Sequence, residues 1–200
     1  MFIVITGLDG SGTSTIANEL NKIDKSSILL KNPNPIYTDR KKIDDIVSKD
    51  SPVANMLYYL SSNFYTSDFI KNNINCKDVN VYCVRYLIDT VVSNRVAGIN
   101  IDLTYEYFGH KLLEPDLTIF VSAKEDVRSK RISNRGKDSL DYRLDDSDTR
   151  EKFLNEFNRL LDINKTLYID NSAENLDSCI KYINNKIVQF KENQNGLFTR

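Results

Sequence analysis

An apolar run, a glycine-rich turn and an amphipathic helix follow one another within the first 23 residues of the chain. Residues 2–5 are apolar with β-branched or aromatic side chains, which favours a buried strand. The turn over residues 7–14 reads Gly-Leu-Asp-Gly-Ser-Gly-Thr-Ser, and Ile16 begins a stripe of apolar residues at helical spacing. Strand, glycine turn and helix in this order form the context of a phosphate-binding loop, so the sequence predicts one here.

The predicted loop departs from the usual pattern at one position. In G-x-x-x-x-G-K-[ST], Gly7, Gly12 and Ser14 stand where expected, but Thr13 replaces the lysine. Lysine would place a mobile cation on the phosphates, whereas threonine offers one neutral hydrogen bond. The backbone N–H groups, the partial positive charge of the helix N-terminus and the Ser14 hydroxyl, which is placed to hold Mg²⁺, do not depend on lysine. We therefore predict phosphate binding rather than a plain turn between a core strand and a helix.

Composition limits the class of protein and its partners. The 200 residues are 40% hydrophobic and 28% charged with a net charge of −1, which suits one α/β domain and provides no basic field for nucleic acid or an anionic membrane. The three cysteines form no CxxC pair, and no apolar run resembles a secretion signal or approaches membrane-spanning length. We expect free thiols, a cytoplasmic location, and no nucleic-acid or membrane partner.

Further strand patterns alternate with helical ones along the chain. The expected strands cover residues 27–30, 79–84, 116–121 and 166–169, and the expected helices cover about 39–48, 52–73, 87–96, 104–113, 124–134, 148–161 and 176–190. This alternation predicts a five-stranded parallel sheet with helices on both faces. We expect a single domain over residues 1–191, with a short mobile lid at about 135–148 and a C-terminal tail over 192–200.

Arginines are the candidates for meeting an anionic ligand. Arg128, Arg131 and Arg135 are spaced by three and four residues, so they share one helix face, where a bound anion would relieve their mutual repulsion. The alternative is that nearby acidic residues, Asp138 among them, neutralise the three arginines as surface pairs. Arg85 directly follows a predicted strand, which is the end where parallel sheets bind ligands.

Two further stretches are more ambiguous. The helix over 52–73 carries a row of tyrosines, and an aromatic stripe is usually core, although Tyr59 could face a ligand base. The basic row over residues 40–42 is expected to be a solvated face rather than a ligand site.

Five motifs in order resemble those of thymidylate kinase and related P-loop nucleoside monophosphate kinases, over nearly the whole chain. Residues 5–15 resemble the loop E-G-x-D-G-S-G-K-S-T. Arg85-Tyr86 resembles D-R-[YH], and the helix that follows it to Asn94 lies where the family has S-x-x-A-Y-Q. Residues 114–121 resemble P-D-L-x-x-x-L, residues 131–136 resemble R-x-x-x-R-G, and residues 168–172 resemble I-D-A-[ST]. The resemblance implies a P-loop NTPase-type fold and a homodimer packed through helices. It also implies phosphoryl transfer from ATP, with Mg²⁺, to a nucleoside monophosphate such as dTMP.

The family's roles carry over where residues match. The loop residues expected to cradle the ATP phosphates are Gly7, Asp9, Gly10, Ser11, Gly12, Thr13, Ser14 and Thr15, with Ser14 on Mg²⁺. Asp9 would also contact the acceptor's sugar hydroxyl, and Arg85 would hold the acceptor's phosphate. Asn94 falls on the glutamine of A-Y-Q and would contact the acceptor. Arg131 and Arg135 would close over the triphosphate as catalytic residues.

The chain departs from the family pattern at several acceptor and metal positions. Val84 replaces the aspartate of D-R, Phe64 falls on the arginine that ends the aromatic helix segment, and the E-P-G-G-T loop is absent. Threonine at the lysine position also occurs in archaeal cytidylate kinases with G-S-G-T-T-T, and lid arginines could supply the missing charge. Two alternatives therefore stay open: a nucleotide-binding protein with lost or weak catalysis, and a kinase for a nucleoside or another small metabolite.

Overall fold

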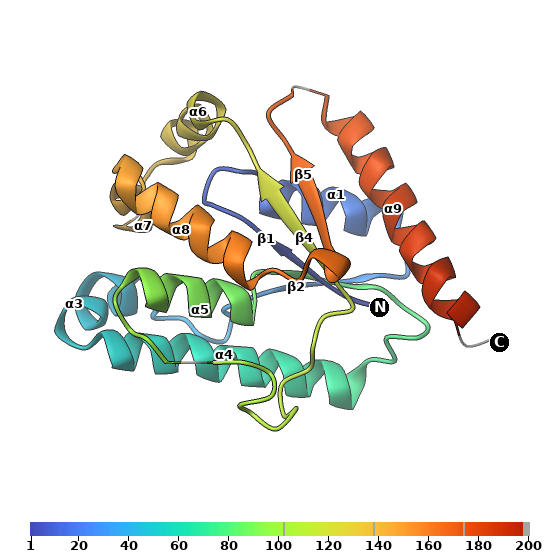
Figure 1. The fold of residues 1–200 in the computed structure, drawn as a ribbon, viewed down its shortest axis with the longest axis horizontal. Coiled ribbons are helices and arrows are strands. Elements are labelled where there is room, and N and C mark those ends of the chain that lie inside the picture. Colours follow the sequence, from blue (N-terminus) through green and yellow to red (C-terminus); the bar gives the residue numbers. More distant parts are fainter. Residues whose placement is uncertain (102, 138, 174, 198–200) are drawn as a thin grey trace.

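A five-stranded parallel sheet forms the centre of the computed structural model, which describes residues 1–101, 103–137, 139–173 and 175–197 (Figure 1). The strands are β1 (Phe2–Thr6), β2 (Ile28–Lys31), β3 (Val81–Val84), β4 (Leu117–Ser122) and β5 (Thr166–Asp170), in the spatial order β2-β3-β1-β4-β5. All four neighbouring pairs are parallel, and Ile5 lies between Val84 and Ile119, so the strands' carboxyl ends share one edge. The predicted fold class is confirmed.

Helices cover both faces of this sheet. They are α1 (Thr13–Ile23), α2 (Arg40–Lys42), a π-helical stretch η1 (Ile43–Val47), α3 (Ser48–Asp50), α4 (Pro52–Asn73), α5 (Leu87–Val96), α6 (Glu125–Arg135), α7 (Ser139–Arg143), α8 (Ser147–Leu160), a 3₁₀ turn η2 (Ile163–Lys165) and α9 (Leu176–Leu197). Figure 1 shows α1 and α9 on one side, with α4, α5 and α8 on the other.

The alternation of side chains along β1 separates two apolar cores. Ile3 and Ile5 pack with α1 and α9, whereas Phe2 and Val4 pack with α4 and α5. A third cluster joins α5 to α8 through Phe120 of β4. It includes Leu8, which lies in the loop after β1. Because both faces of the strands are buried, β1 reads as a continuous apolar run.

Local signals explain where several helices begin or fail to form. Ser51 caps α4 by accepting a hydrogen bond from the Ala54 backbone N–H at 3.3 Å, and Pro52 occupies the first helical position. The helix expected over 104–113 is wrong, because the segment forms turns in which Gly109 and His110 have φ angles of 57° and 58°. Consecutive left-handed residues cannot continue an α-helix.

The predicted lid and tail contain more regular structure than expected. Gly136, with φ 87°, ends α6, and the short helix α7 then lies within the predicted lid, followed by the buried side chain of Leu144. The helix α9 continues to Leu197, beyond the expected domain end at residue 191. Residue 138 of the predicted lid and residues 198–200 of the predicted tail lie outside the described residues. In the described part of the chain, no helix is both long enough and apolar enough to cross a bilayer.

Candidate active site

The loop between β1 and α1 is tightly enclosed, which explains its glycines. A Cβ on Gly10 would lie 2.8 Å from the Arg128 backbone oxygen, and one on Gly12 would lie 2.3 Å from Asn171 Nδ2. Both glycines also have left-handed φ angles, 83° and 103°. A side chain at either position would push the loop away from its neighbours, so the spacing seen in the sequence serves close backbone packing.

Three side chains from distant elements hold the carbonyl oxygens of the loop. The Arg128 guanidinium donates to Asp9 O at 2.6 Å, and the Ser11 carbonyl accepts from Arg131 at 3.1 Å and from the Asn171 amide at 2.8 Å. In a trans peptide the C=O and the following N–H point in opposite directions. The N–H groups of Gly10 and Gly12 therefore point away from these three side chains, which is the arrangement that binds an anion.

The N-terminus of α1 adds to this anion site. Its first N–H groups have no partner within the helix, and the N-cap residue Gly12 has no side chain that could accept from them. The first turn contains no acidic residue. Thr13 is buried, whereas Ser14 and Thr15 are exposed on the helix end. The predicted loop residues thus lie together in one turn and the start of α1, with Ser14 and Thr15 on the exposed side.

The three arginines of α6 have different surroundings. Arg128 does not fit the expected contact with a bound anion, because its side chain is 3% exposed, pairs with Glu125 at 2.9 Å and donates to Asp9 O. Arg131 lies against the loop, donating to Asn171 O at 2.9 Å, with its Nη1 atom 3.6 Å from where a Cβ on Gly12 would lie. Arg135 lies at the end of α6, half exposed, and donates to both carboxylate oxygens of Asp141 at 2.7 and 2.8 Å.

Arg85 joins the loop to the helix α5. Its guanidinium pairs with Asp9 at 2.6 Å and with Asp89 at 2.8 Å. Asp89 was not among the predicted site residues. It occupies the third position of α5, where it accepts from the Tyr86 backbone N–H at 3.0 Å, and it also accepts from the Thr6 hydroxyl at 2.7 Å. Its position four residues after Arg85 is the only sequence signal that could have indicated it.

The positive charges of three arginines act on the Asp9 carboxylate. Burial pushes the pKa of Asp9 upward, but the cations of Arg85, Arg135 and Arg40 outweigh burial, and the pKa lies below the usual value. Within the described chain, Asp9 Oδ2 is buried and has no hydrogen-bond partner. An ionised, half-satisfied carboxylate beside an anion-binding loop is suited to accept a hydrogen bond from a ligand hydroxyl.

Arg40 differs from the solvated face expected for residues 40–42, because its side chain is partly buried and paired within the protein, whereas Lys41 and Lys42 are exposed as expected. Its Nε donates to the Tyr59 hydroxyl at 3.2 Å and lies 3.3 Å from Asp44, and that hydroxyl donates to Asp44 at 2.6 Å. Its charge lowers the pKa of Asp9 and opposes that of Arg85. Tyr59 therefore orients an arginine through its hydroxyl, which is a different role from the base contact expected for it.

Asn94 lies in a buried polar network beside α4 and α5. Its amide donates to Thr90 O at 2.7 Å, and Asn63 donates to the Thr90 hydroxyl at 2.9 Å. Asn32, just after β2, donates to Asn63 at 2.6 Å. Phe64 packs edge-on against Phe108, with ring centroids 5.2 Å apart. The network connects the end of β2 to both helices.

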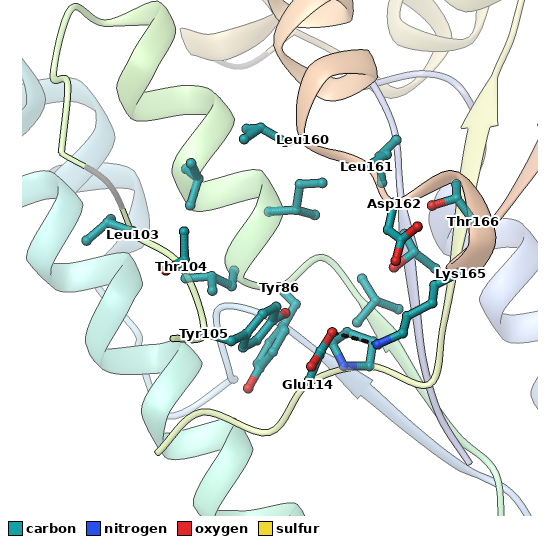
Figure 2. Close-up of a pocket in the computed structure, with 16 residues that line it drawn as sticks. Tyr86, Leu103, Thr104, Tyr105, Glu114, Leu160, Leu161, Asp162, Lys165 and Thr166 are labelled. Carbon is teal, nitrogen blue, oxygen red and sulfur yellow. Dashed lines mark hydrogen bonds and ion pairs between the residues drawn. The ribbon is translucent and has the colours of Figure 1, made fainter. Parts of the chain in front are cut away.

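A separate cavity of about 220 Å³ lies between α5, the end of α8 and the segment around Tyr105 (Figure 2). It extends from Thr118 and Thr166, at the amino ends of β4 and β5, to Tyr86 and Leu87 at the start of α5, and residues 7–15 of the phosphate loop are not among the residues that line it. Figure 2 shows the Glu114–Lys165 ion pair, 2.8 Å long, beside it. The cavity is therefore distinct from the site built around the loop.

A parallel sheet whose first strand leads into a glycine loop, with arginines gathered around that loop, defines a P-loop kinase. A family model described as thymidylate kinase matches residues 5–181, and the chain belongs to the thymidylate kinase family. It is thus a nucleoside monophosphate kinase, and the family implies ATP as the phosphate donor.

Individual relatives resemble the chain over nearly its full length. Thymidylate kinase from Mycoplasmoides gallisepticum is 27% identical, covering 96% of both chains. Among solved structures, thymidylate kinase from Candida albicans matches with a TM-score of 0.73 and 20% identity, over 95% of this chain and 92% of that one. Deoxyadenosine kinase from M. mycoides with bound dATP matches with a TM-score of 0.69 and 21% identity, over 94% and 99%. The two structures share the fold.

Proposed function

We propose that the protein transfers the γ-phosphoryl group of Mg²⁺-ATP to a deoxynucleoside monophosphate, with dTMP as the first acceptor to test. The observation that carries the proposal is the ion pair of 2.6 Å between Arg85 and Asp9. It brings the arginine that follows β3 against the phosphate loop, so a donor triphosphate and an acceptor phosphate would be held side by side. Phosphoryl transfer depends chiefly on this positioning and on charge neutralisation.

The donor half of the site consists of the loop and the lid. The N–H groups of the loop and the α1 N-terminus would bind the phosphates, and Arg131 supplies a fixed cation beside Gly12. Arg135 would turn from Asp141 toward the triphosphate when the lid closes and excludes water. The exposed Ser14 hydroxyl fits Mg²⁺ as one oxygen ligand, the remaining ones being phosphate and water oxygens. When bound, Mg²⁺ would neutralise the charge developing on the phosphates.

Val84 leaves the protein with fewer metal ligands than the family pattern has. Its side chain packs in the apolar core shared by α1 and α9, so no carboxylate reaches Ser14 from that position. In the part of the chain that the structure describes, no cluster of three histidine, cysteine or acidic residues could hold a metal alone. This supports a metal that arrives with the nucleotide.

The acceptor half favours a ligand that already carries a phosphate. The Arg85 guanidinium pairs with Asp9, and the charges of Arg85 and Arg40 both lower the pKa of that carboxyl, so a phosphate bound beside Arg85 would also relieve the repulsion between the two arginines. Asp9 Oδ2 would accept from the sugar hydroxyl, and Asn94 would line the acceptor pocket. A nucleoside acceptor, as the name of the M. mycoides neighbour suggests for that protein, would leave both arginines without an anion. The dTMP assignment follows the names of the curated relatives.

The wider organisation also follows as a proposal. One domain over residues 1–191, extended by the end of α9, would close its lid at about 135–148 over the donor. A homodimer would form through α4, whose Val53, Leu57, Tyr65 and Phe69 are 37–53% exposed and form a stripe, at spacings of four and eight residues, that winds gradually around the helix. The free thiols of Cys76, Cys83 and Cys179 are compatible with a reducing cytoplasm.

An acceptor panel with ADP detection tests the function. The purified protein is incubated with ATP and Mg²⁺ and, separately, dTMP, dUMP, dCMP, the purine monophosphates and the matching deoxynucleosides. We expect ADP formation with at least one monophosphate, dTMP first, and none without Mg²⁺. Nucleotide-induced thermal stabilisation without turnover on any monophosphate would contradict the kinase and favour a binding protein. Turnover on nucleosides alone would contradict the proposal that the acceptor is a monophosphate.

A further inference from the structure

Asp89 is a buried carboxylate, and both of its oxygens accept hydrogen bonds from protein groups. Its side chain is 10% exposed. Oδ1 accepts from the Thr6 hydroxyl at 2.7 Å and from Arg85 Nη1 at 2.8 Å, and Oδ2 accepts from the Tyr86 backbone N–H at 3.0 Å. Nothing in the proposed chemistry uses Asp89 directly. A carboxylate that satisfies a helix cap needs only the last of these contacts, so the other two call for a separate explanation.

Arg85 combines an unusual backbone conformation with two acidic partners for its side chain. Its φ angle of 66° is one of two left-handed values among the described non-glycine residues. Asp89 binds one terminal nitrogen and Asp9 binds the other, so the plane of the guanidinium is fixed from two sides. Three of the five N–H groups of an arginine stay available when two are used in this way. With a side chain 21% exposed, Arg85 can present them to a ligand.

Compared with the family motifs, the types of side chain at positions 6 and 89 are also interchanged. In E-G-x-D-G-S-G-K-S-T a glutamate stands where this chain has Thr6, and in S-x-x-A-Y-Q a serine stands where it has Asp89. The carboxylate has moved from the strand to the helix, and the hydroxyl has moved the other way. Both pairs contain the same number of side-chain heavy atoms, and here the two groups meet in a hydrogen bond of 2.7 Å. This chain thus places one hydroxyl and one carboxylate together, with the carboxylate on Arg85.

We propose that Asp89 is a positioning residue which, braced by the Thr6 hydroxyl, fixes the Arg85 guanidinium for the phosphate of the acceptor. The inference rests on the proposed function, since it assigns Arg85 to the acceptor. It makes the Thr6–Asp89 pair the counterpart of a glutamate–serine pair with the positions exchanged. The side chain acts through Arg85 and touches no reacting atom. Asp89 cannot replace the missing metal ligand, because it lies on the α5 face whereas Val84 faces α1.

Asp89→Asn separates positioning from capping and from simple charge. Asparagine keeps an oxygen for the Tyr86 N–H, so α5 keeps its cap. We expect kcat/KM for the acceptor to fall about tenfold or more, with the KM for ATP and the melting temperature nearly unchanged. A purely electrostatic role predicts the opposite, a lower acceptor KM, because loss of a carboxylate makes the pocket more attractive to a phosphate dianion. That result, or unchanged kinetics, would overturn the proposal.

The exchanged pair provides the second arm. Thr6→Glu and Asp89→Ser should each lower acceptor kcat/KM about tenfold, whereas the double variant should return to within about threefold of the wild type. A double variant no better than the poorer single one, if folded, would overturn the proposal. If it does not fold, a cycle of Thr6→Val and Asp89→Asn replaces it, with non-additive losses expected and additive losses contradicting the pair. Asp177→Asn, in the exposed first turn of α9, is the matched control.

Turnover by the wild-type protein shows whether the proposed function or only the role of Asp89 fails. If the wild type phosphorylates no monophosphate, the proposed function fails before any variant is compared. If it does and the Asp89 variants behave like the wild type, only the role of Asp89 fails.

Discussion

Arg128 braces the phosphate loop by donating to the backbone carbonyl of Asp9 at 2.6 Å, from a side chain that is 3% exposed. The same guanidinium pairs with Glu125 and reaches Leu144 O, within the predicted lid, at 3.4 Å. One buried cation thus connects the loop, α6 and the segment that follows α7. This contact makes the loop geometry depend on the lid region, although 119 residues separate the two partners.

Replacement of Arg128 by methionine should therefore destabilise the protein. The change leaves Asp9 O without its donor in a buried place, and we expect the free energy of unfolding to drop by about 3 kcal/mol. Urea denaturation followed by circular dichroism measures the drop. Arg159→Met is the control, because Arg159 is half exposed and pairs with Glu156, so its loss should cost at most about 1 kcal/mol. Equal effects of the two variants would contradict the bracing role.

Arg131 should carry the charge that the loop lacks at Thr13. Arg131→Met should lower kcat about a hundredfold, because a fixed cation packed against the loop is removed and its charge no longer acts on the bound phosphates. Adding Thr13→Lys to this variant should restore at least about tenfold, since lysine returns a cation to the same loop. Steady-state kinetics with varied ATP measure both effects. Lys130→Met, an exposed neighbour on α6, should stay near the wild type. No recovery in the double variant would argue against a shared role.

Arg40 should contribute to acceptor binding through its charge. Arg40→Met removes a cation that acts on Asp9 and Arg85, so we expect acceptor kcat/KM to fall about tenfold, with ATP kinetics unchanged. Initial rates at varied acceptor concentration measure this. Lys41→Met is the matched control, because Lys41 is exposed on the next position of the same basic row. A similar loss for both would indicate a general field rather than a contact.

The local pattern was enough to predict the strand, the loop and the helix at the start of the chain. Each depends on residues within a few positions, and alternation of strands and helices then sets the parallel sheet. The position of Arg85 at the carboxyl end of β3 was also predicted, because the residue directly follows an apolar run that forms a strand. Helix and loop signals of this kind depend only on residues that are close in the sequence.

The roles of Arg40, Arg128 and Asp89 could not be read in the same way. Arg128 shares a helix face with Arg131, and nothing nearby shows that only one of the two is buried on Asp9. The pairing of Thr6 with Asp89 spans 83 residues. Such contacts depend on how the sheet brings distant segments together, and spacing within one element does not contain that information.

The stripe on α4 should hold the homodimer together. Leu57 is 53% exposed, so Leu57→Glu should leave the fold intact while placing a charge in an apolar interface, and the dimer should become monomeric. Sedimentation velocity at micromolar concentration measures the change. Ile163→Glu is the control, since Ile163 is 79% exposed in a turn after α8. A wild type that is already monomeric, or a dimeric variant, would contradict the assignment of this face.

Asp89 should give stability an unusual dependence on pH. Burial is the largest influence and raises the pKa of Asp89 above its usual value of 3.8, even though Arg85, Thr6 and the Tyr86 N–H favour the charged form. Since the folded state binds this proton more readily than the unfolded state, ionised Asp89 costs stability at neutral pH. The cost disappears as pH falls through the folded pKa toward the unfolded value.

The comparison with Asp89→Asn isolates this effect, because asparagine does not titrate. The free energy of unfolding of the wild type, relative to the variant, should rise as pH is lowered from 7 to about 4. Melting temperatures of both proteins at several pH values measure the difference, and other titrating groups cancel in it. A relative stability that falls with acid would mean that Arg85 and Thr6 outweigh burial, placing the pKa of Asp89 below 3.8 rather than above it.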